Sequence, residues 1–115
     1  MSDMGFLDTL FEAIENRRAA APEDSYTAQL LADLPRAARK LGEEGVEAAI
    51  AALAEDEAAL ISEAADMTYH LLVVLAARGL TPSQVIEELQ RREGVSGLAE
   101  KASRQNDKAS DTASD

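Results

Sequence analysis

The chain contains 115 residues, of which 22 are acidic and 11 are basic, and it contains no cysteine. The length fits one small domain, and without cysteine there can be no disulfide, thiolate zinc site or cysteine nucleophile. The formal net charge of −11 would repel the phosphates of DNA or RNA, so no nucleic-acid partner is expected, although an acidic protein still binds an anionic nucleotide when a cation bridges the two.

The first predicted element is a helix that begins after Ser2 or Asp3 and ends near Ala21-Pro22. Its apolar side chains follow the three- and four-residue spacing of one helix face. They are Phe6, Leu7, Leu10, Phe11 and Ile14. A polar connection then leads to a short turn that carries Tyr26, Leu30 and Leu31.

Two longer helices are predicted in the middle of the chain. Asp33 can cap a helix that runs to about Ala54. Asp56 can cap the next helix, which runs to about Arg78 and stops at Gly79, a residue suited to the left-handed position after a helix end. The connection between the two is short enough for an antiparallel hairpin.

The C-terminal part contains one more predicted helix and a polar tail. Thr81-Pro82-Ser83-Gln84 has the form of a capping box, which predicts a helix to about Arg92. A short helical turn is expected around Leu98 to Ala102, and the polar residues that follow are expected to be disordered. The predicted organisation is one all-α domain over residues 1–103 and a disordered tail over residues 104–115.

The sequence also predicts where the protein works and in what state. Its N-terminus lacks a basic region followed by an apolar run, and its longest strongly apolar run, Leu71 to Ala77, is far shorter than the roughly 20 residues that cross a bilayer. We therefore expect a cytoplasmic protein with no membrane contact. A domain this short gains stability by burying surface in an oligomer, so we expect at least a dimer.

Both central helices carry acidic residues three positions apart. Glu44 and Glu47 lie about 60° apart around the first of them, and Glu63 and Asp66 repeat this spacing on the second. In an antiparallel hairpin the two pairs lie at comparable distances from the connection and can face one another. Because carboxylates this close repel unless a cation neutralises them, the pattern favours a site for Mg²⁺, with Mn²⁺ as the alternative.

Such a site suits the hydrolysis of a phosphoanhydride. The cation can bridge phosphate oxygens and neutralise the charge of a leaving pyrophosphate, and a carboxylate such as Glu43 or Glu47 can take the proton of the attacking water. Spacing alone does not decide which acid is the base. Lys40 could bind a substrate phosphate or could form an ordinary helix ion pair with Glu44.

A simpler interpretation is also open, because glutamates at this spacing usually form a solvated helix face. Residues 67–77 argue against it, because they are apolar nearly all round, as expected of a helix buried on most sides. Glu63 and Asp66 lie on the same helix just before this buried stretch. Buried acids need partners, and Lys40 is the only basic residue within one helical turn of Glu44. His70, one turn after Asp66, could orient a water, but a packed residue with a satisfied hydrogen bond is its more usual role.

The acidic pairs also carry a resemblance. Glu44-x-x-Glu47 followed by Glu63-x-x-Asp66 resembles the all-α nucleoside triphosphate pyrophosphohydrolases, a superfamily that includes the MazG proteins and dimeric dUTPases. Within it, four segments covering roughly Leu7 to Arg92 together look like the phosphoribosyl-ATP pyrophosphohydrolases of histidine biosynthesis. The segments are Ser25-Tyr26-Thr27-x-x-Leu30, Lys40-Leu41-Gly42-Glu43-Glu44-x-x-Glu47, Glu63-Ala64-Ala65-Asp66-x-x-Tyr69-His70-Leu71-Leu72 and Leu75-Ala76-Ala77-Arg78-Gly79-Leu80.

This resemblance implies a cytoplasmic, dimeric, four-to-five-helix MazG-like bundle. The enzyme would use Mg²⁺ to hydrolyse phosphoribosyl-ATP to phosphoribosyl-AMP and pyrophosphate, the second step of histidine biosynthesis. The implied metal ligands are Glu44, Glu47, Glu63 and Asp66, and Glu43 is the implied assisting acid. Gly45 departs from the helix former expected there, which costs about 1 kcal/mol of helix propensity but removes no ligand.

Two other functions stay open. A housecleaning pyrophosphohydrolase of the same superfamily would keep every ligand and change only the pocket for the nucleotide. An acidic helical interaction module would bind a basic partner without any metal, and Glu63→Gln or Asp66→Asn would then change no activity. We prefer the enzyme hypothesis, because an interaction module without a metal would leave the acids next to a buried helical stretch unpaired.

Overall fold

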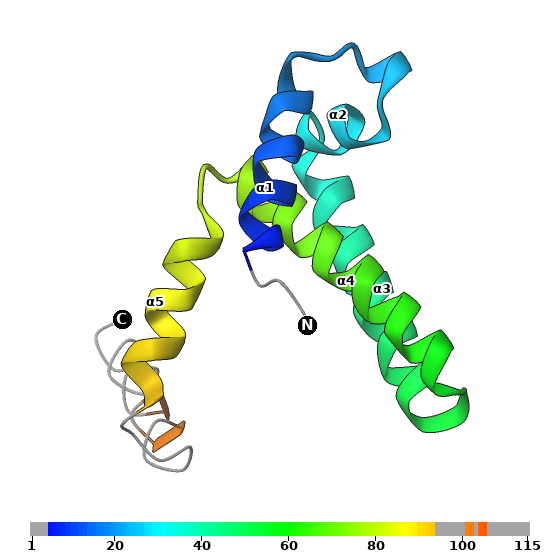
Figure 1. Cartoon of the computed structure of the whole chain (residues 1–115), viewed down its shortest axis with the longest axis vertical. Coiled ribbons are helices and arrows are strands. Elements are labelled where there is room, and N and C mark those ends of the chain that lie inside the picture. The colour runs from blue at the N-terminus through cyan, green and yellow to red at the C-terminus, as the bar shows by residue number, and fades with distance from the viewer. Residues whose placement is uncertain (1–4, 94–100, 103, 106–115) are drawn as a thin grey trace, which may run out of the picture. The chain divides into compact units, whose positions relative to one another are not determined.

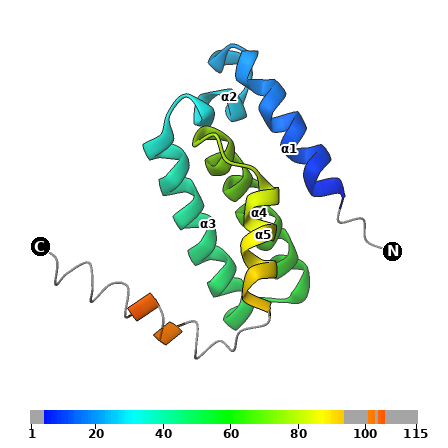
Figure 2. The same cartoon turned by 90° about the vertical axis from the view of Figure 1, so that its left-hand side faces the viewer.

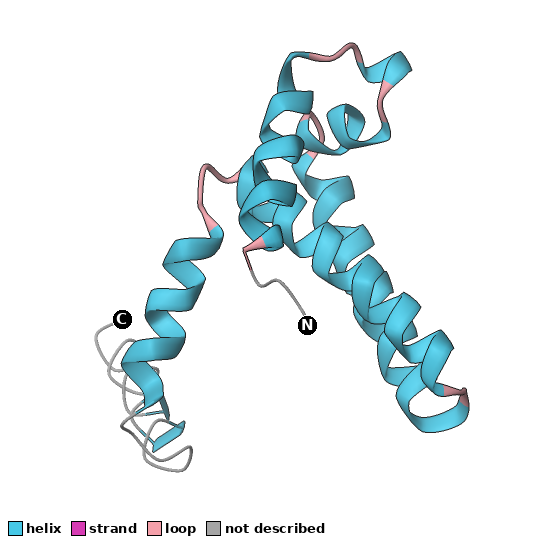
Figure 3. Cartoon of the chain, in the orientation of Figure 1, coloured by secondary structure: helices cyan, strands magenta, loops and turns pink. Residues whose placement is uncertain are grey.

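The described part of the chain consists of helices joined by loops and contains no strand, as the sequence predicts (Figure 3). The computed structural model describes residues 5–93, 101, 102, 104 and 105. Its α-helices are α1 (Phe6–Asn16), α2 (Tyr26–Leu31), α3 (Leu34–Ala54), α4 (Glu57–Ala77) and α5 (Pro82–Glu93), and two short 3₁₀ turns lie at Arg17–Ala19 and Pro22–Asp24. The all-α class with five helices is confirmed for these residues.

The centre of the fold is the predicted hairpin of α3 and α4, which lie side by side along their length (Figures 1 and 2). The side chain of Asp33 accepts a hydrogen bond from the backbone N–H of Arg36 at 3.2 Å and so caps α3. Asp56 caps α4 in the same way through Ala59, at 2.9 Å. After α4, Gly79 adopts a φ of 72°, the left-handed conformation predicted for it.

The N-terminal region differs from the prediction in two places. The first helix ends at Asn16, short of the predicted Ala21-Pro22, because the backbone turns extended at Ala20 and Ala21. The ring of Pro22 disfavours the helical conformation in the residue before it, so Ala21 cannot continue the helix. The segment predicted as a short turn forms α2, which Ser25 caps by accepting from the N–H of Ala28 at 3.1 Å.

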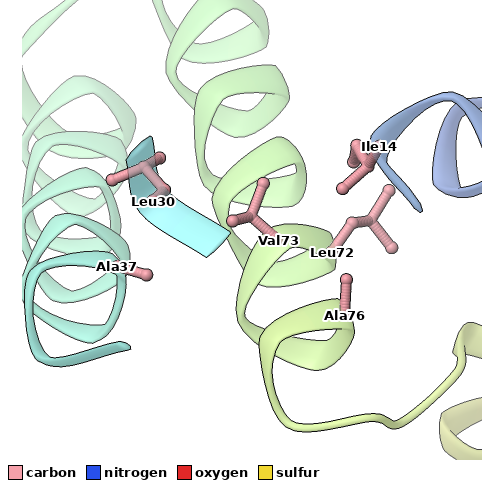
Figure 4. Close-up of a cluster of buried hydrophobic side chains, with 6 residues drawn as sticks. All are labelled: Ile14, Leu30, Ala37, Leu72, Val73 and Ala76. Atoms are coloured by element: carbon pink, nitrogen blue, oxygen red, sulfur yellow. The ribbon is translucent and has the colours of Figure 1, made fainter. Parts of the chain in front are cut away.

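One small apolar core joins α1, α2 and α3 to the C-terminal half of α4. In Figure 4, Leu72 lies beside Ile14 of α1, and Val73 lies on the side of Leu30 of α2. Leu30 and Val73 are completely buried. The full set of buried core residues is Ile14, Leu30, Ala37, Leu72, Val73 and Ala76.

The end of α1 is also fastened to the end of α4 by a polar contact. The guanidinium of Arg18 donates to the main-chain carbonyl of Ala76 at 2.7 Å and to the carboxylate of Glu15 at 3.1 Å. The same carbonyl also accepts from the backbone N–H of Gly79 at 3.1 Å, and a cation is favourable at this C-terminal end of the helix.

Residues 67–77 of α4 are buried or half-buried except for Leu71, which is 38% exposed, so the burial expected of this apolar stretch is confirmed. Nearer the start of α4, outside that stretch, Ile61 is 70% exposed. By length and composition, α4 is also the one described helix that could cross a membrane, which is weak evidence because the core helix of a soluble protein meets the same criterion.

The chain divides into two units, residues 1–82 and residues 83–115, so α5 is considered by itself. It begins at the predicted Pro82 and exposes an apolar stripe that includes Ile86 and Leu89. Hydrogen bonds from Arg91 and Arg92 lower the pKa of the exposed Glu88 to about 2, so this carboxylate stays charged in mild acid.

Little of the predicted C-terminal region falls within the described residues. Residues 101, 102, 104 and 105 are helical, so helical structure is found as far as residue 105, three positions beyond the predicted end at Ala102. Leu98 and residues 106–115 lie outside the described residues. The boundary placed between residues 103 and 104 therefore stays a prediction.

The conformation of Gly79 predicts a stability effect. An alanine in the left-handed conformation costs roughly 1–2 kcal/mol, so Gly79→Ala should lower the free energy of unfolding by about that amount. The matched control is Gly42→Ala, because a Cβ at Gly42 of α3 meets no atom within 4 Å and should stabilise the helix by up to about 1 kcal/mol. Urea unfolding followed by circular dichroism, at one protein concentration, measures both. Equal effects of the two substitutions would contradict the assignment.

Candidate metal centre

The α3/α4 hairpin brings three of the predicted metal ligands together. Glu44 of α3 and Glu63 and Asp66 of α4 each place one carboxylate oxygen within 4.8 Å of the others. Capping by Asp33 and Asp56 fixes where the two helices begin, and the short connection between them fixes their register. Three of the four paired acids therefore meet across the hairpin, and Glu47 is not among them.

Glu44 is buried, Glu63 is half-buried and Asp66 is exposed, and one oxygen in each of the first two carboxylates has no hydrogen-bond partner among the described residues. Glu44 is only 8% exposed, and its Oε2 atom and the Oε2 atom of Glu63 are both buried and unpaired. Leaving a buried polar group unsatisfied costs about 1–3 kcal/mol, and more when the group is charged. A ligand that accepts lone pairs from both oxygens would remove this cost.

The local charge fits a divalent cation. Lys40 is the only cation of the described residues within ion-pair distance of the three acids, with its Nζ atom 3.7 Å from Glu44 Oε1. Three carboxylates and one ammonium leave two negative charges uncompensated. Oxygens that share one Mg²⁺ ion lie at most about 4.2 Å apart, so a 4.8 Å spread closes with small side-chain rotations. The acidic cluster of Glu44, Glu63 and Asp66 could therefore bind a metal ion.

The two other acids predicted to act here lie at the margin of the acidic cluster. Glu47 is exposed on α3 and is not one of the three converging residues. It lies about 60° around the helix and one turn from Glu44, so its carboxylate is within reach after a rotamer change. The Oε1 atom of Glu43 lies 3.7 Å from Lys40 Nζ, and 49% of the Glu43 side chain is exposed. Lys40 thus contacts both Glu43 and Glu44, as the ion-pair interpretation expects.

His70 anchors the part of α4 that carries Asp66. Its Nδ1 atom donates to the main-chain carbonyl of Asp66 at 2.7 Å, and in the neutral ring its Nε2 atom accepts from the hydroxyl of Tyr26 at 3.2 Å. The guanidinium of Arg36 lies 5.7 Å from the centre of the Tyr26 ring. His70 is buried with both nitrogens engaged, which fits the packed role favoured by the sequence.

A second contact ties α2 to α4. The hydroxyl groups of Thr27 and Tyr69 are hydrogen-bonded, and the Thr27 side chain is buried. Sequence analysis missed both this pair and the pair of Tyr26 with His70, because their partners are separated by more than 40 positions and no local pattern relates them. In the sequence, only the family-like segment Ser25-Tyr26-Thr27-x-x-Leu30 indicated that Tyr26 and Thr27 have a structural role.

Comparison with known proteins identifies close relatives. The chain matches the family described as phosphoribosyl-ATP pyrophosphohydrolase over residues 7–93. It is 55% identical over 102 residues to a protein of Cereibacter sphaeroides, covering 88% of this chain and 99% of that protein. It is 57% identical to a protein of Methylobacterium nodulans and 60% identical to one of Paracoccus denitrificans, each over 85% of this chain and 92% of the relative. All three relatives are named phosphoribosyl-ATP pyrophosphatase.

The unpaired carboxylates predict a stability effect of metal. Adding Mg²⁺ should raise the melting temperature of the wild type, since a ligand at 100 times its Kd adds about 2.7 kcal/mol. Glu63→Gln should lose this increase and should be at least as stable as the wild type in chelator, because the substitution removes a buried charge. Differential scanning calorimetry with and without Mg²⁺ measures this.

The matched control for this prediction is Glu12→Gln, which changes an exposed acid of α1 outside the acidic cluster. It should keep the full increase. An increase that survives in Glu63→Gln would contradict the assignment of this residue to the metal site.

Proposed function

The chain belongs to the phosphoribosyl-ATP pyrophosphohydrolase family, and from this premise we propose how its residues release pyrophosphate from phosphoribosyl-ATP. The enzyme is a hydrolase that converts phosphoribosyl-ATP to phosphoribosyl-AMP in histidine biosynthesis. Water supplies a hydroxyl to phosphorus, the bond between the α- and β-phosphates breaks, and one proton leaves the water. The site must therefore hold a polyphosphate of high negative charge and accept a proton.

Mg²⁺ is the cofactor that the acidic cluster fits best. We assign Glu44, Glu63 and Asp66 as its ligands, because their oxygens converge and two of them otherwise stay buried without partners. Glu47 completes the set from the next turn of α3. Hard oxygen ligands favour Mg²⁺, and Mn²⁺ accepts the same donors. When bound, the ion supplies charge neutralisation for the phosphates and for the leaving pyrophosphate.

The residues around the acidic cluster supply the proposed general base, the proposed phosphate contact and the positioning of Asp66. Glu43 is the proposed general base, because its carboxylate is half exposed to water and has the same ammonium neighbour as the buried Glu44. The ammonium of Lys40 holds a phosphate oxygen once substrate approaches, since at 3.7 Å its two ion pairs are loose enough to exchange. His70 and Tyr26 keep the turn of α4 at Asp66 in place.

We favour phosphoribosyl-ATP as the substrate over the two alternatives that the sequence left open, a housecleaning pyrophosphohydrolase and an acidic interaction module. Relatives with 52–60% identity carry the same substrate in their names, which favours phosphoribosyl-ATP over the broader set of nucleotides of a housecleaning enzyme. An acidic interaction module would bind its partner through exposed carboxylates, which does not explain why two carboxylate oxygens are buried without hydrogen-bond partners. We further propose that the enzyme works in the cytoplasm without a nucleic-acid or membrane partner, which the net charge of −11 supports.

Substitution of the proposed base and of a proposed ligand should separate their roles. Glu43→Gln should lower kcat by roughly 10²–10⁴-fold, the usual contribution of a general base, and should keep the affinity for Mn²⁺. Asp66→Asn should lose both turnover and Mn²⁺ binding. Pyrophosphate release from phosphoribosyl-ATP, with and without chelator, and calorimetric titration with Mn²⁺ measure the two effects. Wild-type turnover that persists in chelator would contradict the metal mechanism.

We also propose that the enzyme is a homodimer formed through α3. Val46, Ile50 and Leu53 follow helical spacing on one face of α3 and are 61%, 52% and 90% exposed. This face, the apolar stripe of α3, lies roughly 120–180° around the helix from Glu44, so it can be covered without closing the acidic cluster. Burying such side chains gains about 1.5–3 kcal/mol each, which a second copy of α3 can supply.

Charge placed in the apolar stripe should prevent association. Leu53→Glu combined with Ile50→Glu should give a monomer in light scattering after size exclusion, where the wild type gives a dimer. Both positions are exposed, so the monomer fold has no reason to change. The control is Ala52→Glu, an exposed position about 100° away from Leu53 on the same helix. A dimer that persists in the double variant would rule out this interface.

A further inference from the structure

A cavity that the mechanism above does not use lies between α1 and α4. Its volume is about 220 Å³, and its walls are Leu10, Ala13, Ile14, Arg17 and Tyr69. Sites for drug-sized ligands enclose roughly 300–1,000 Å³, so this cavity fits one part of a ligand, such as a flat ring system. Its lining is mainly apolar and contains one aromatic ring and one guanidinium.

The aromatic wall of the cavity is held rigidly. The hydroxyl of Tyr69 is hydrogen-bonded to Thr27 on α2, and the Tyr69 ring packs edge-to-face on His70, with centroids 5.7 Å apart at 83°. A ring fixed in this way loses little conformational entropy when a second ring stacks on it. Tyr69 is therefore prepared to bind a heteroaromatic ring.

The guanidinium of Arg17 is available to an anion. Arg18, its neighbour, is committed to Ala76 and Glu15, whereas Arg17 is exposed and forms no ion pair with any described residue. A free cation beside an apolar cavity is unusual in a chain whose net charge is −11. The combination suits a ligand that joins a flat ring to a phosphate.

The cavity lies close to the acidic cluster. Tyr69 follows Asp66 by three positions on α4, which is a rise of about 4.5 Å and a rotation of about 60°. A nucleotide whose phosphates lie at Asp66 can therefore place its base beside Tyr69 without leaving this helix.

We propose that the cavity between α1 and α4 binds the adenine ring of phosphoribosyl-ATP against Tyr69, and that Arg17 binds the phosphate of the ribosyl group attached to that ring. This assignment rests on the proposed function, because it places the triphosphate at the acidic cluster. It makes Arg17 a residue that selects phosphoribosyl-ATP over ATP, since ATP lacks the ribosyl phosphate.

Two substitutions test the site from opposite sides. Arg17→Ala removes the cation, and Ala13→Leu fills the cavity from an exposed position of α1. Each should raise KM for phosphoribosyl-ATP about tenfold or more and leave the affinity for Mn²⁺ unchanged; tenfold corresponds to about 1.4 kcal/mol. Arg104→Ala and Ala52→Leu are the matched controls, because both change exposed residues outside the cavity. Circular dichroism verifies that each variant folds.

The outcomes distinguish this site from the metal site. Raised KM in both variants, with wild-type values in both controls, supports the inference. An unchanged KM in either Arg17→Ala or Ala13→Leu overturns it. Failure of the metal proposal would show elsewhere, as a wild type that binds no Mn²⁺ and releases pyrophosphate in chelator.

Discussion

The meeting of three carboxylates between α3 and α4 is the constraint on which the rest of the structure depends. Like charges this close oppose the packing of the two helices. Lys40 offsets one of the three charges, and the buried Oε2 atoms of Glu44 and Glu63 have no hydrogen-bond partner among the described residues. The hairpin keeps its register because Asp33 and Asp56 cap the two helices and because the core holds the other end of α4. Under our proposal a divalent cation at the acidic cluster would remove this repulsion and so couple stability to function.

The two smaller N-terminal helices, α1 and α2, pack against α4 of this hairpin. Helix α2 is tied to α4 by two side-chain contacts, one through Tyr26 and His70 and one through Thr27 and Tyr69. The first contact ends on the main chain at Asp66, so a small helix far from the α3–α4 connection helps to position a proposed metal ligand. Helix α1 covers the neighbouring face of α4 and forms, with α4, the cavity that we assign to adenine. In this proposal the metal ligand Asp66 and the adenine contact Tyr69 lie one turn apart on α4, and the phosphate contact Arg17 lies across the cavity from Tyr69.

Much of this arrangement was predictable because it depends on local rules. Capping residues, the glycine after α4 and the three-residue spacing of the acids are each properties of a few consecutive positions. The sequence failed where partners are distant: it gave no sign that Tyr26 contacts His70 or that Arg17 borders a cavity. The expected burial of residues 67–77 agrees with the structure, because a helix that is apolar nearly all round needs cover on most sides.

The most direct test of the account is a crystal structure of the enzyme with Mn²⁺, analysed by anomalous scattering. We predict an anomalous peak within about 2.0–2.3 Å of carboxylate oxygens of Glu44, Glu63 and Asp66, the distance at which small divalent cations bind such ligands. Glu47 should have turned toward the same ion. A fully occupied peak at other residues, or no peak at the acidic cluster at saturating Mn²⁺, would contradict the central claim that these converging carboxylates hold a metal.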